Sequence, residues 1–302
     1  MNTSAPSDAI GPGAHDVLGK LVRVLQLEQI EVDLFRGPRT DEPWPRVYGG
    51  EVIGQALMAA CKTVDAARPV HSLHAYFMRP GDPHAPILYQ VERDRDGGSF
   101  TSRRVVAIQH GQRILNLAAS FHVREPGLNH QFDMPEVPGP EGLRSEHQLW
   151  REWSEDLPES RRTLMLRERP LEFRPVVPRR PRDAGKTEAR QAFWFRANAP
   201  VPEEQTLHRV MLAYASDATL LGASMLPHGL HWLVHPVQEA SLDHALWIHD
   251  DIDIGHWMLY VQDSPWTGAA RGIARGLIYT VAGKLVASVM QEGLIRSKPG
   301  SV

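Results

Sequence analysis

The sequence contains one cysteine, Cys61, in 302 residues. One cysteine cannot form an intramolecular disulfide, and it cannot supply the several thiolates of a cysteine-based zinc or iron–sulfur site. An excess of one charge is also missing, because 33 Lys and Arg residues face 36 Asp and Glu residues. A broad nucleic-acid surface needs a clear basic excess, so we exclude nucleic acid as a partner.

Long apolar runs are missing as well. A membrane-spanning helix needs about 18 consecutive apolar residues. The longest apolar stretches, at 52–61 and 273–289, are interrupted by Gln55, Arg275 and Lys284. The N-terminus lacks the basic and apolar regions of a secretory signal. We therefore expect no membrane span, a disordered lead-in over residues 1–14, and a cytoplasmic protein.

Several catalytic signatures are absent too. The sequence has no G-x-S-x-G nucleophile turn, no H-E-x-x-H metal motif and no G-x-x-x-x-G-K-[ST] phosphate loop. His244, His249 and His256 lie close together in sequence. His244 and His249 nevertheless fall on opposite faces of one predicted strand, so they cannot easily share an ion. We expect neither a metal nor a cofactor.

What is present is a regular pattern of helices and strands. In the first half, apolar spacing predicts helices over 16–28 and 51–67. Alternating apolar and polar residues predict strands at 71–79, 87–93, 100–109 and 114–123. Residues 125–142 are rich in proline and glycine, which is typical of a linker.

The second half repeats this order after a connecting segment. That segment has a predicted helix at 146–156 and an arginine- and proline-rich stretch at 170–182, which is either a phosphate-binding loop or a solvated connection. A strand at 189–196 and a helix at 204–221 follow, and then strands at 240–249, 257–263, 271–280 and 284–295. The repetition predicts a duplicated α+β fold with units at 15–125 and 189–302, joined by residues 126–188.

Asp217 is the most informative single residue. On the predicted helix its neighbours three, four and seven positions away are Val210, Ala213, Tyr214, Leu220 and Leu221. It therefore falls on the apolar stripe, where an ionised carboxylate is costly without partners. Asp217 is either a catalytic general base or a structural carboxylate hydrogen-bonded to a backbone turn.

Gln291 and Ser241 are weaker candidates. Gln291 is the one polar member of an alternating apolar face, where a buried amide needs partners for its donors and acceptor. Ser241 lies near the start of a predicted strand, on the face of Asp243, Ala245 and Trp247. No His–Asp pair has a recognisable spacing to Ser241, so the sequence does not indicate a serine nucleophile.

Long motifs in both halves resemble the acyl-CoA thioesterase II (TesB-type) family. In the second half they are LAYASD at 212–217, SLDHALWIH at 241–249 and ASVMQEG at 287–293. In the first half they are LFRG at 34–37, VYGGEVIGQAL at 47–57, YFMRPGD at 76–82 and GSFTSRRV at 98–105. The similarity extends from about residue 21 to residue 296.

The resemblance implies a double hotdog, in which two antiparallel sheets each wrap a long helix. It also implies hydrolysis of acyl-CoA, of medium to long chain length, to a free acid and coenzyme A. The family's water-holding Asp, Ser or Thr, and Gln match Asp217, Ser241 and Gln291, all in the second half. We expect acyl-CoA as the ligand and a homo-oligomer.

Two other functions stay open at this point. Hotdog folds also bind acyl-CoA without turnover, but such a module has no need for three polar residues on otherwise apolar faces. A hotdog hydratase would need a histidine beside an acid on the active helix, and Asp217 has no such neighbour in sequence. Acyl-CoA hydrolysis is therefore the favoured hypothesis.

Overall fold

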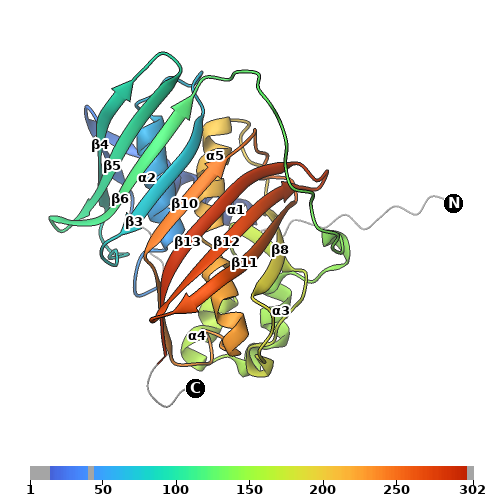
Figure 1. The fold of residues 1–302 in the computed structure, drawn as a ribbon. Helices are drawn as coiled ribbons and strands as arrows, with labels where there is room; N and C mark the ends of the chain where they lie inside the picture. The colour runs from blue at the N-terminus through green and yellow to red at the C-terminus, as the bar shows by residue number, and fades with distance from the viewer. Residues whose placement is uncertain (1–13, 40–43, 298–302) are drawn as a thin grey trace.

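The computed structural model describes residues 14–39 and 44–297, so nearly all of the expected lead-in lies outside the described residues (Figure 1). The longer helices are α1 (Ala14–Leu25), α2 (Gly49–Cys61), α3 (Glu146–Glu152), α4 (Glu159–Met165) and α5 (Gln205–Ser216). Four 3₁₀ segments are η1 (Pro140–Gly142), η2 (Ser154–Asp156), η3 (Pro181–Asp183) and η4 (Leu220–His228). None of the helices in the described ranges is long and apolar enough to cross a membrane.

The strands of the first half are β1 (Glu28–Glu31), β2 (Leu34–Gly37), β3 (Val70–Phe77), β4 (Ile87–Asp96), β5 (Phe100–Gln109) and β6 (Gln112–His122). The remaining strands are β7 (Leu171–Pro175), β8 (Arg190–Ala197), β9 (Val237–Ser241), β10 (Asp243–Ile248), β11 (Met258–Gly268), β12 (Arg271–Thr280) and β13 (Leu285–Ser297).

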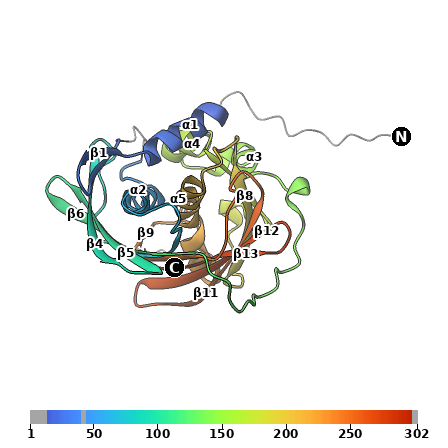
Figure 2. The same ribbon diagram turned by 90° about the horizontal axis from the view of Figure 1, so that it is seen from above.

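The strands form one continuous antiparallel sheet in the order β1-β2-β4-β5-β6-β3-β10-β13-β12-β11-β8-β7, with β9 added beside β13. Each half contributes a similar run, β4-β5-β6-β3 and β11-β12-β13-β10, and the two runs meet where β3 pairs with β10. The sheet curves around α2 and α5, which lie side by side within it (Figure 2). The predicted α+β double hotdog is confirmed, with its two sheets joined into one.

The two central helices run antiparallel and very close together. An added Cβ on Gly50 would lie 2.3 Å from the carbonyl oxygen of Tyr214, and one on Gly54 would lie 3.5 Å from that of Val210. Glycine at these positions lets the backbone of α2 approach that of α5. The start of α2 therefore meets the end of α5.

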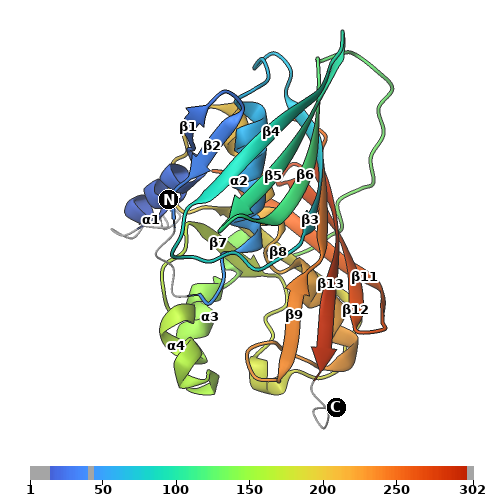
Figure 3. The ribbon, with the colours of Figure 1, turned by 90° about the vertical axis from the view of Figure 1, so that its left-hand side faces the viewer.

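The linker after β6 does more than connect the two halves. It runs along the outside of the second half, as the green segment in Figures 1 and 3 shows. Gln131 exchanges hydrogen bonds with the β12–β13 hairpin, donating to Gly283 and accepting from Leu285. Met134 and Val137 pack on an outer cluster around Trp194 and Tyr279. The linker thus covers the outer face of β8, β11 and β12.

Several predicted boundaries were wrong. The helix expected over 51–67 ends at Cys61, and the one expected over 204–221 ends at Ser216. Strands β1 and β2 and helix α4 were not predicted, because short segments carry little periodic signal. The strand expected at 240–249 is two strands, β9 and β10.

The stretch at 170–182 is only partly a solvated connection. It contains β7, an edge strand, where the terminal Pro175 is tolerated. Arg174 is buried, bonded to Glu172 and stacked 4.7 Å from the ring centre of Trp257. Arg180 and Arg182 pair with Asp156. These arginines hold the connecting segment together, so neither interpretation of the stretch describes them.

The close helix contact predicts that Gly50→Ala destabilises the protein. Alanine at an open helical position stabilises by about 1 kcal/mol relative to glycine. At Gly50 the methyl group meets backbone, so overpacking should instead lower the free energy of unfolding by about 1–3 kcal/mol. Gly142→Ala, with nothing within 4 Å of its added Cβ, is the control. Thermal unfolding measures both, and a Gly50→Ala protein more stable than the parent would contradict the close approach.

Candidate active site

Asp217 lies directly after the last turn of α5, as its C-cap residue. The sequence placed it inside a longer helix on a buried stripe, and both points were wrong, because the helix ends at Ser216 and Asp217 is partly exposed. A capping position leaves its carboxylate at the edge of the core. It can therefore meet both buried side chains and solvent.

Two tyrosines hold the end of α5 in place. Tyr48, just before α2, donates to the carbonyl oxygen of Tyr214 at 3.0 Å, and Tyr260 on β11 donates to that of Ser216 at 2.8 Å. Carbonyls in the last turn of a helix lack helical partners, so these bonds satisfy groups that need them. Burial, with a smaller contribution from the Asp217 charge, raises the pKa of both hydroxyls well above the usual value. They remain protonated donors.

The carboxylate of Asp217 faces the start of α2. An added Cβ on Gly49 would lie 2.7 Å from Oδ2 of Asp217 and 3.0 Å from Cζ of Phe77. The N-terminus of a helix carries partial positive charge and N–H groups without helical partners. A negative group is therefore favoured here, and only glycine leaves room for it.

A β-bulge brings Ser241 into the site. Ser241 pairs with Gly293 and Ala245 pairs with Met290, so three residues, 242–244, oppose only two, 291–292. The extra residue shifts the alternation of side chains. Ser241 and His244 consequently both face Gln291, whereas a regular strand would place them on opposite faces. The expectation that Ser241 shares a face with Ala245 and Trp247 was wrong.

The three predicted residues meet in one hydrogen-bonded chain. The Ser241 hydroxyl donates to Oδ1 of Asp217 at 3.3 Å, and Nε2 of Gln291 donates to Oγ of Ser241 at 2.8 Å. Gln291 is almost fully buried, as its alternating pattern predicted. The helix end, the bulged strand and the last strand each contribute one member.

His244 extends this chain, although no sequence pattern indicated that it would. Its Nδ1 lies 2.6 Å from Oε1 of Gln291, and its Nε2 lies 2.9 Å from Oγ of Ser216. It is 1% exposed, and burial lowers its pKa. A predicted bulge at this point would have placed His244 on the same face as Ser241. Leu242 is neither glycine nor proline, so the local sequence does not indicate a bulge. His249 lies on the other face and contacts Ser288.

Glu239 is a second acid near the site that sequence reasoning missed. It lies two residues before Ser241 on β9 and therefore on the same face. Burial raises the pKa of Glu239, and the nearby charge of Asp217 adds to the effect, while Arg46 and Arg161 oppose it. Arg46 also donates to the carbonyl oxygen of Glu239 at 2.9 Å.

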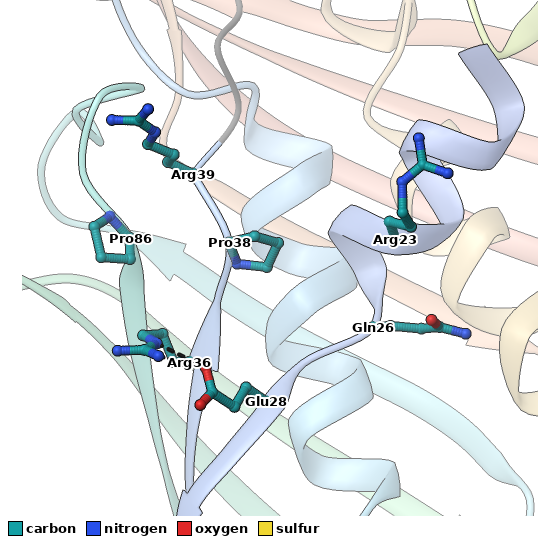
Figure 4. Close-up of a pocket in the computed structure, with 7 residues that line it drawn as sticks. All are labelled: Arg23, Gln26, Glu28, Arg36, Pro38, Arg39 and Pro86. Carbon is teal, nitrogen blue, oxygen red and sulfur yellow. Dashed lines mark hydrogen bonds and ion pairs between the residues drawn. The ribbon is translucent and has the colours of Figure 1, made fainter. Parts of the chain in front are cut away.

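A surface cavity of about 430 Å³ lies elsewhere, between α1, β2 and the start of β4. It is lined by Arg23, Gln26, Glu28, Arg36, Pro38, Arg39 and Pro86. Figure 4 shows that the three arginine side chains point in different directions, with Arg36 paired to Glu28. None of the four residues of the hydrogen-bonded chain lines this cavity, so it is separate from the candidate site.

The residues that the structure describes contain no cluster of three or more His, Cys, Asp or Glu side chains placed to hold a metal ion. The candidate site contains a carboxylate, a hydroxyl, an amide and an imidazole. Such a set can hold a water molecule and accept its proton. It supplies oriented donors and one charged acceptor.

Comparisons with known proteins identify the family of the chain. A family model for acyl-CoA thioesterases matches residues 160–294, and one for the acyl-CoA thioesterase N-terminal domain matches residues 40–122. Acyl-coenzyme A thioesterase 8 of Homo sapiens is 41% identical over 98% of this chain and 96% of its own length. Acyl-CoA thioesterase 2 of Haemophilus influenzae is 38% identical over 93% of this chain and 98% of its own.

A solved structure shows the same relationship. Acyl-CoA thioesterase II TesB2 from Mycobacterium marinum is 40% identical, with a TM-score of 0.75 over 93% of this chain and 99% of that one. Its likeness extends through both halves, as do the two family models. The chain therefore belongs to the TesB-type acyl-CoA thioesterase II family.

Proposed function

We propose that this protein hydrolyses acyl-CoA thioesters with a water molecule that Asp217 activates and that Ser241 and Gln291 orient. The observation that carries the proposal is the contact of these three side chains at the point where α5 ends against the start of α2. Family membership supports the substrate class, and the geometry supports the roles.

In the proposed reaction, Asp217 accepts a proton from the water as its oxygen attacks the thioester carbonyl carbon. The carbonyl oxygen becomes negatively charged, and in this proposal N–H groups at the start of α2 stabilise that charge. The C–S bond then breaks, the acid is released, and the proton on Asp217 passes to the sulfur of coenzyme A. Holding the water in place supplies much of the rate, because a thioester carbonyl is already electrophilic.

The contacts of Ser241 favour an orienting role over a nucleophilic one. Its hydroxyl faces the carboxylate of Asp217 and the amide N–H of Gln291. The nearby imidazole of His244 contacts Gln291 and Ser216. The base in contact with the Ser241 hydroxyl is the carboxylate of Asp217 and not an imidazole held by an acid behind it, so this arrangement differs from a Ser–His–Asp site.

Asp217→Asn removes the proton acceptor and keeps the shape of the side chain. We expect turnover to fall at least about a hundredfold, with little change in stability. Thiol release from acyl-CoA measures turnover, and thermal unfolding measures stability. Glu239→Gln is the matched variant at the neighbouring acid. If it abolishes hydrolysis while Asp217→Asn retains it, the base has been assigned to the wrong carboxylate.

Ser241→Ala should lower the rate without abolishing it, because Asp217 and Gln291 can still hold the water. Mass spectrometry during turnover should detect no acyl adduct on the protein. Addition of EDTA should leave the rate unchanged, since the proposed reaction uses no metal ion. An acyl group trapped on Ser241 would replace this mechanism with covalent catalysis.

Gly49→Ala tests the contact between Asp217 and the start of α2. Its methyl group would displace the carboxylate or the Phe77 ring, so we expect kcat to fall about ten- to a hundredfold. Gly98→Ala, whose added Cβ has nothing within 4 Å, controls for a general effect of the substitution. A Gly49→Ala protein with unchanged kcat would show that this close approach does not matter for catalysis.

We further propose that the substrate is acyl-CoA of medium to long chain length, on the basis of the family resemblance. We also propose that the protein is a cytoplasmic homo-oligomer. The outward-facing Tyr76 on β3 and Met290 on β13 are 63% and 37% exposed, which supports contact between copies of the chain. Turnover measured with a panel of acyl-CoA chain lengths tests the proposed substrate, and light scattering tests whether the protein forms an oligomer. Tight binding of acyl-CoA without thiol release would favour a non-catalytic binding module.

A further inference from the structure

We infer that His244 is a positioning residue that determines which way the amide of Gln291 faces. This inference rests on the proposed function, because Gln291 is assigned there to orient the attacking water. The hydrogen-bond partners of His244 are Gln291 and Ser216, so its contact with the proposed water-holding residues runs through Gln291.

The single hydroxyl hydrogen of Ser241 is committed first. Its two polar neighbours are Oδ1 of Asp217 at 3.3 Å and the amide of Gln291 at 2.8 Å. An ionised carboxylate only accepts hydrogen bonds, and a bond to a charged acceptor is stronger than one to a neutral acceptor. The hydrogen of Ser241 therefore points to Asp217.

The orientation of Gln291 follows from this. With its hydrogen already used, Oγ of Ser241 can only accept from the amide, so the amide nitrogen must face it. The amide oxygen, Oε1, then points the other way, toward His244. The reverse orientation would place Oε1 against an oxygen that has no hydrogen left to offer.

His244 completes this orientation from the buried side. Oε1 of Gln291 lies 2.6 Å from Nδ1 of His244, and because a carbonyl oxygen only accepts, Nδ1 must carry a hydrogen. Oγ of Ser216 lies 2.9 Å from Nε2 and 3.0 Å from the carbonyl oxygen of Ala213. Ser216 can therefore donate to a neutral ring or accept from a charged one. In both protonation states Nδ1 donates to Gln291.

This orientation of Gln291 turns its second amide hydrogen toward the candidate site. One hydrogen on Nε2 is used by Ser241, and the other stays on the Ser241 side of the amide, where the water or the developing oxyanion lies in the proposed reaction. A reversed amide would present an acceptor there instead. His244 thus supplies the donor that keeps Gln291 a donor to the site.

Two substitutions separate donation from bulk. His244→Asn can place an amide N–H near the position of Nδ1, so it should keep kcat within about fivefold of the parent. His244→Leu fills similar space without a donor and should lower kcat at least about tenfold, with KM within about twofold, because the lost interaction bears on the transition state. Equal losses in the two variants would overturn the inference.

A double-mutant cycle tests whether His244 acts through Gln291. In a Gln291→Leu protein, the further change His244→Leu should lower kcat by less than about twofold. A second tenfold loss in that background would show that His244 acts independently, and the inference would fail. His208→Leu is the matched control. His208 is also buried, but it accepts from the backbone N–H of Ile254 and does not belong to the hydrogen-bonded chain of the candidate site. It should alter stability and leave kcat unchanged.

A spectroscopic measurement does not depend on activity or on a variant that folds poorly. In ¹⁵N-histidine NMR of the intact protein, the ring of His244, assigned from its absence in His244→Asn, should show a protonated Nδ1. A ring protonated only at Nε2 would overturn the inference even in an active enzyme. Conversely, a protonated Nδ1 in a protein that releases no thiol would sustain the positioning role of His244 in the folded chain and reject the proposed hydrolysis.

Discussion

The close approach of α2 and α5 is the constraint on which the site depends. Glycines at the start of α2 let its backbone touch the last turn of α5, so the two helices can run antiparallel with their ends in register. That contact places the capping residue Asp217 at the positive end of α2. Larger residues on α2 would separate the helices and remove the carboxylate from the helix N-terminus that favours it.

The duplication makes two such junctions, and they have diverged. At one, the cap of α5 is Asp217, which faces the start of α2. At the other, the cap of α2 is Lys62, at the end of the helix that lies beside the start of α5. The cap residue is thus a partly exposed acid at one junction and an exposed lysine at the other. Both halves still contribute to the candidate site, since Tyr48 and Gly49 of the first half bound the carboxylate of the second.

Much of the fold could be predicted from the sequence because most strands are long and half-buried. β5, β6, β12 and β13 alternate clearly, and positive φ at His110, Gly111 and Gly283 marks the tight turns that join them in pairs. The short β1 is exposed along its whole length, so it carries no alternation to detect. The end of α5 could not be predicted locally, because it depends on tertiary contacts. Tyr48 and Tyr260, from distant segments, donate to the carbonyl groups of its last turn.

The candidate residues could be named from the sequence, but their arrangement could not. Gln291 broke an apolar alternation, and Asp217 stood among apolar neighbours, so each was visible as a local exception. Ser241 and His244 are three residues apart, and in a regular strand that spacing separates them. The one-residue bulge that brings them together is defined by pairing with β13, which no local pattern of β9 and β10 encodes.

The hydrogen-bonded chain also explains how polar groups survive in this core. Its inner members, His244 and Gln291, are each 1% exposed, and each can be satisfied while uncharged. Its outer members, Ser241 and Asp217, are partly exposed, so the one formal charge lies where solvent can reach it. A buried charge without partners would be costly, whereas a neutral chain whose donors all point outward strengthens each bond toward the carboxylate. The same direction of donation that stabilises the fold also aims the N–H and O–H groups of this hydrogen-bonded chain toward the partly exposed carboxylate of Asp217.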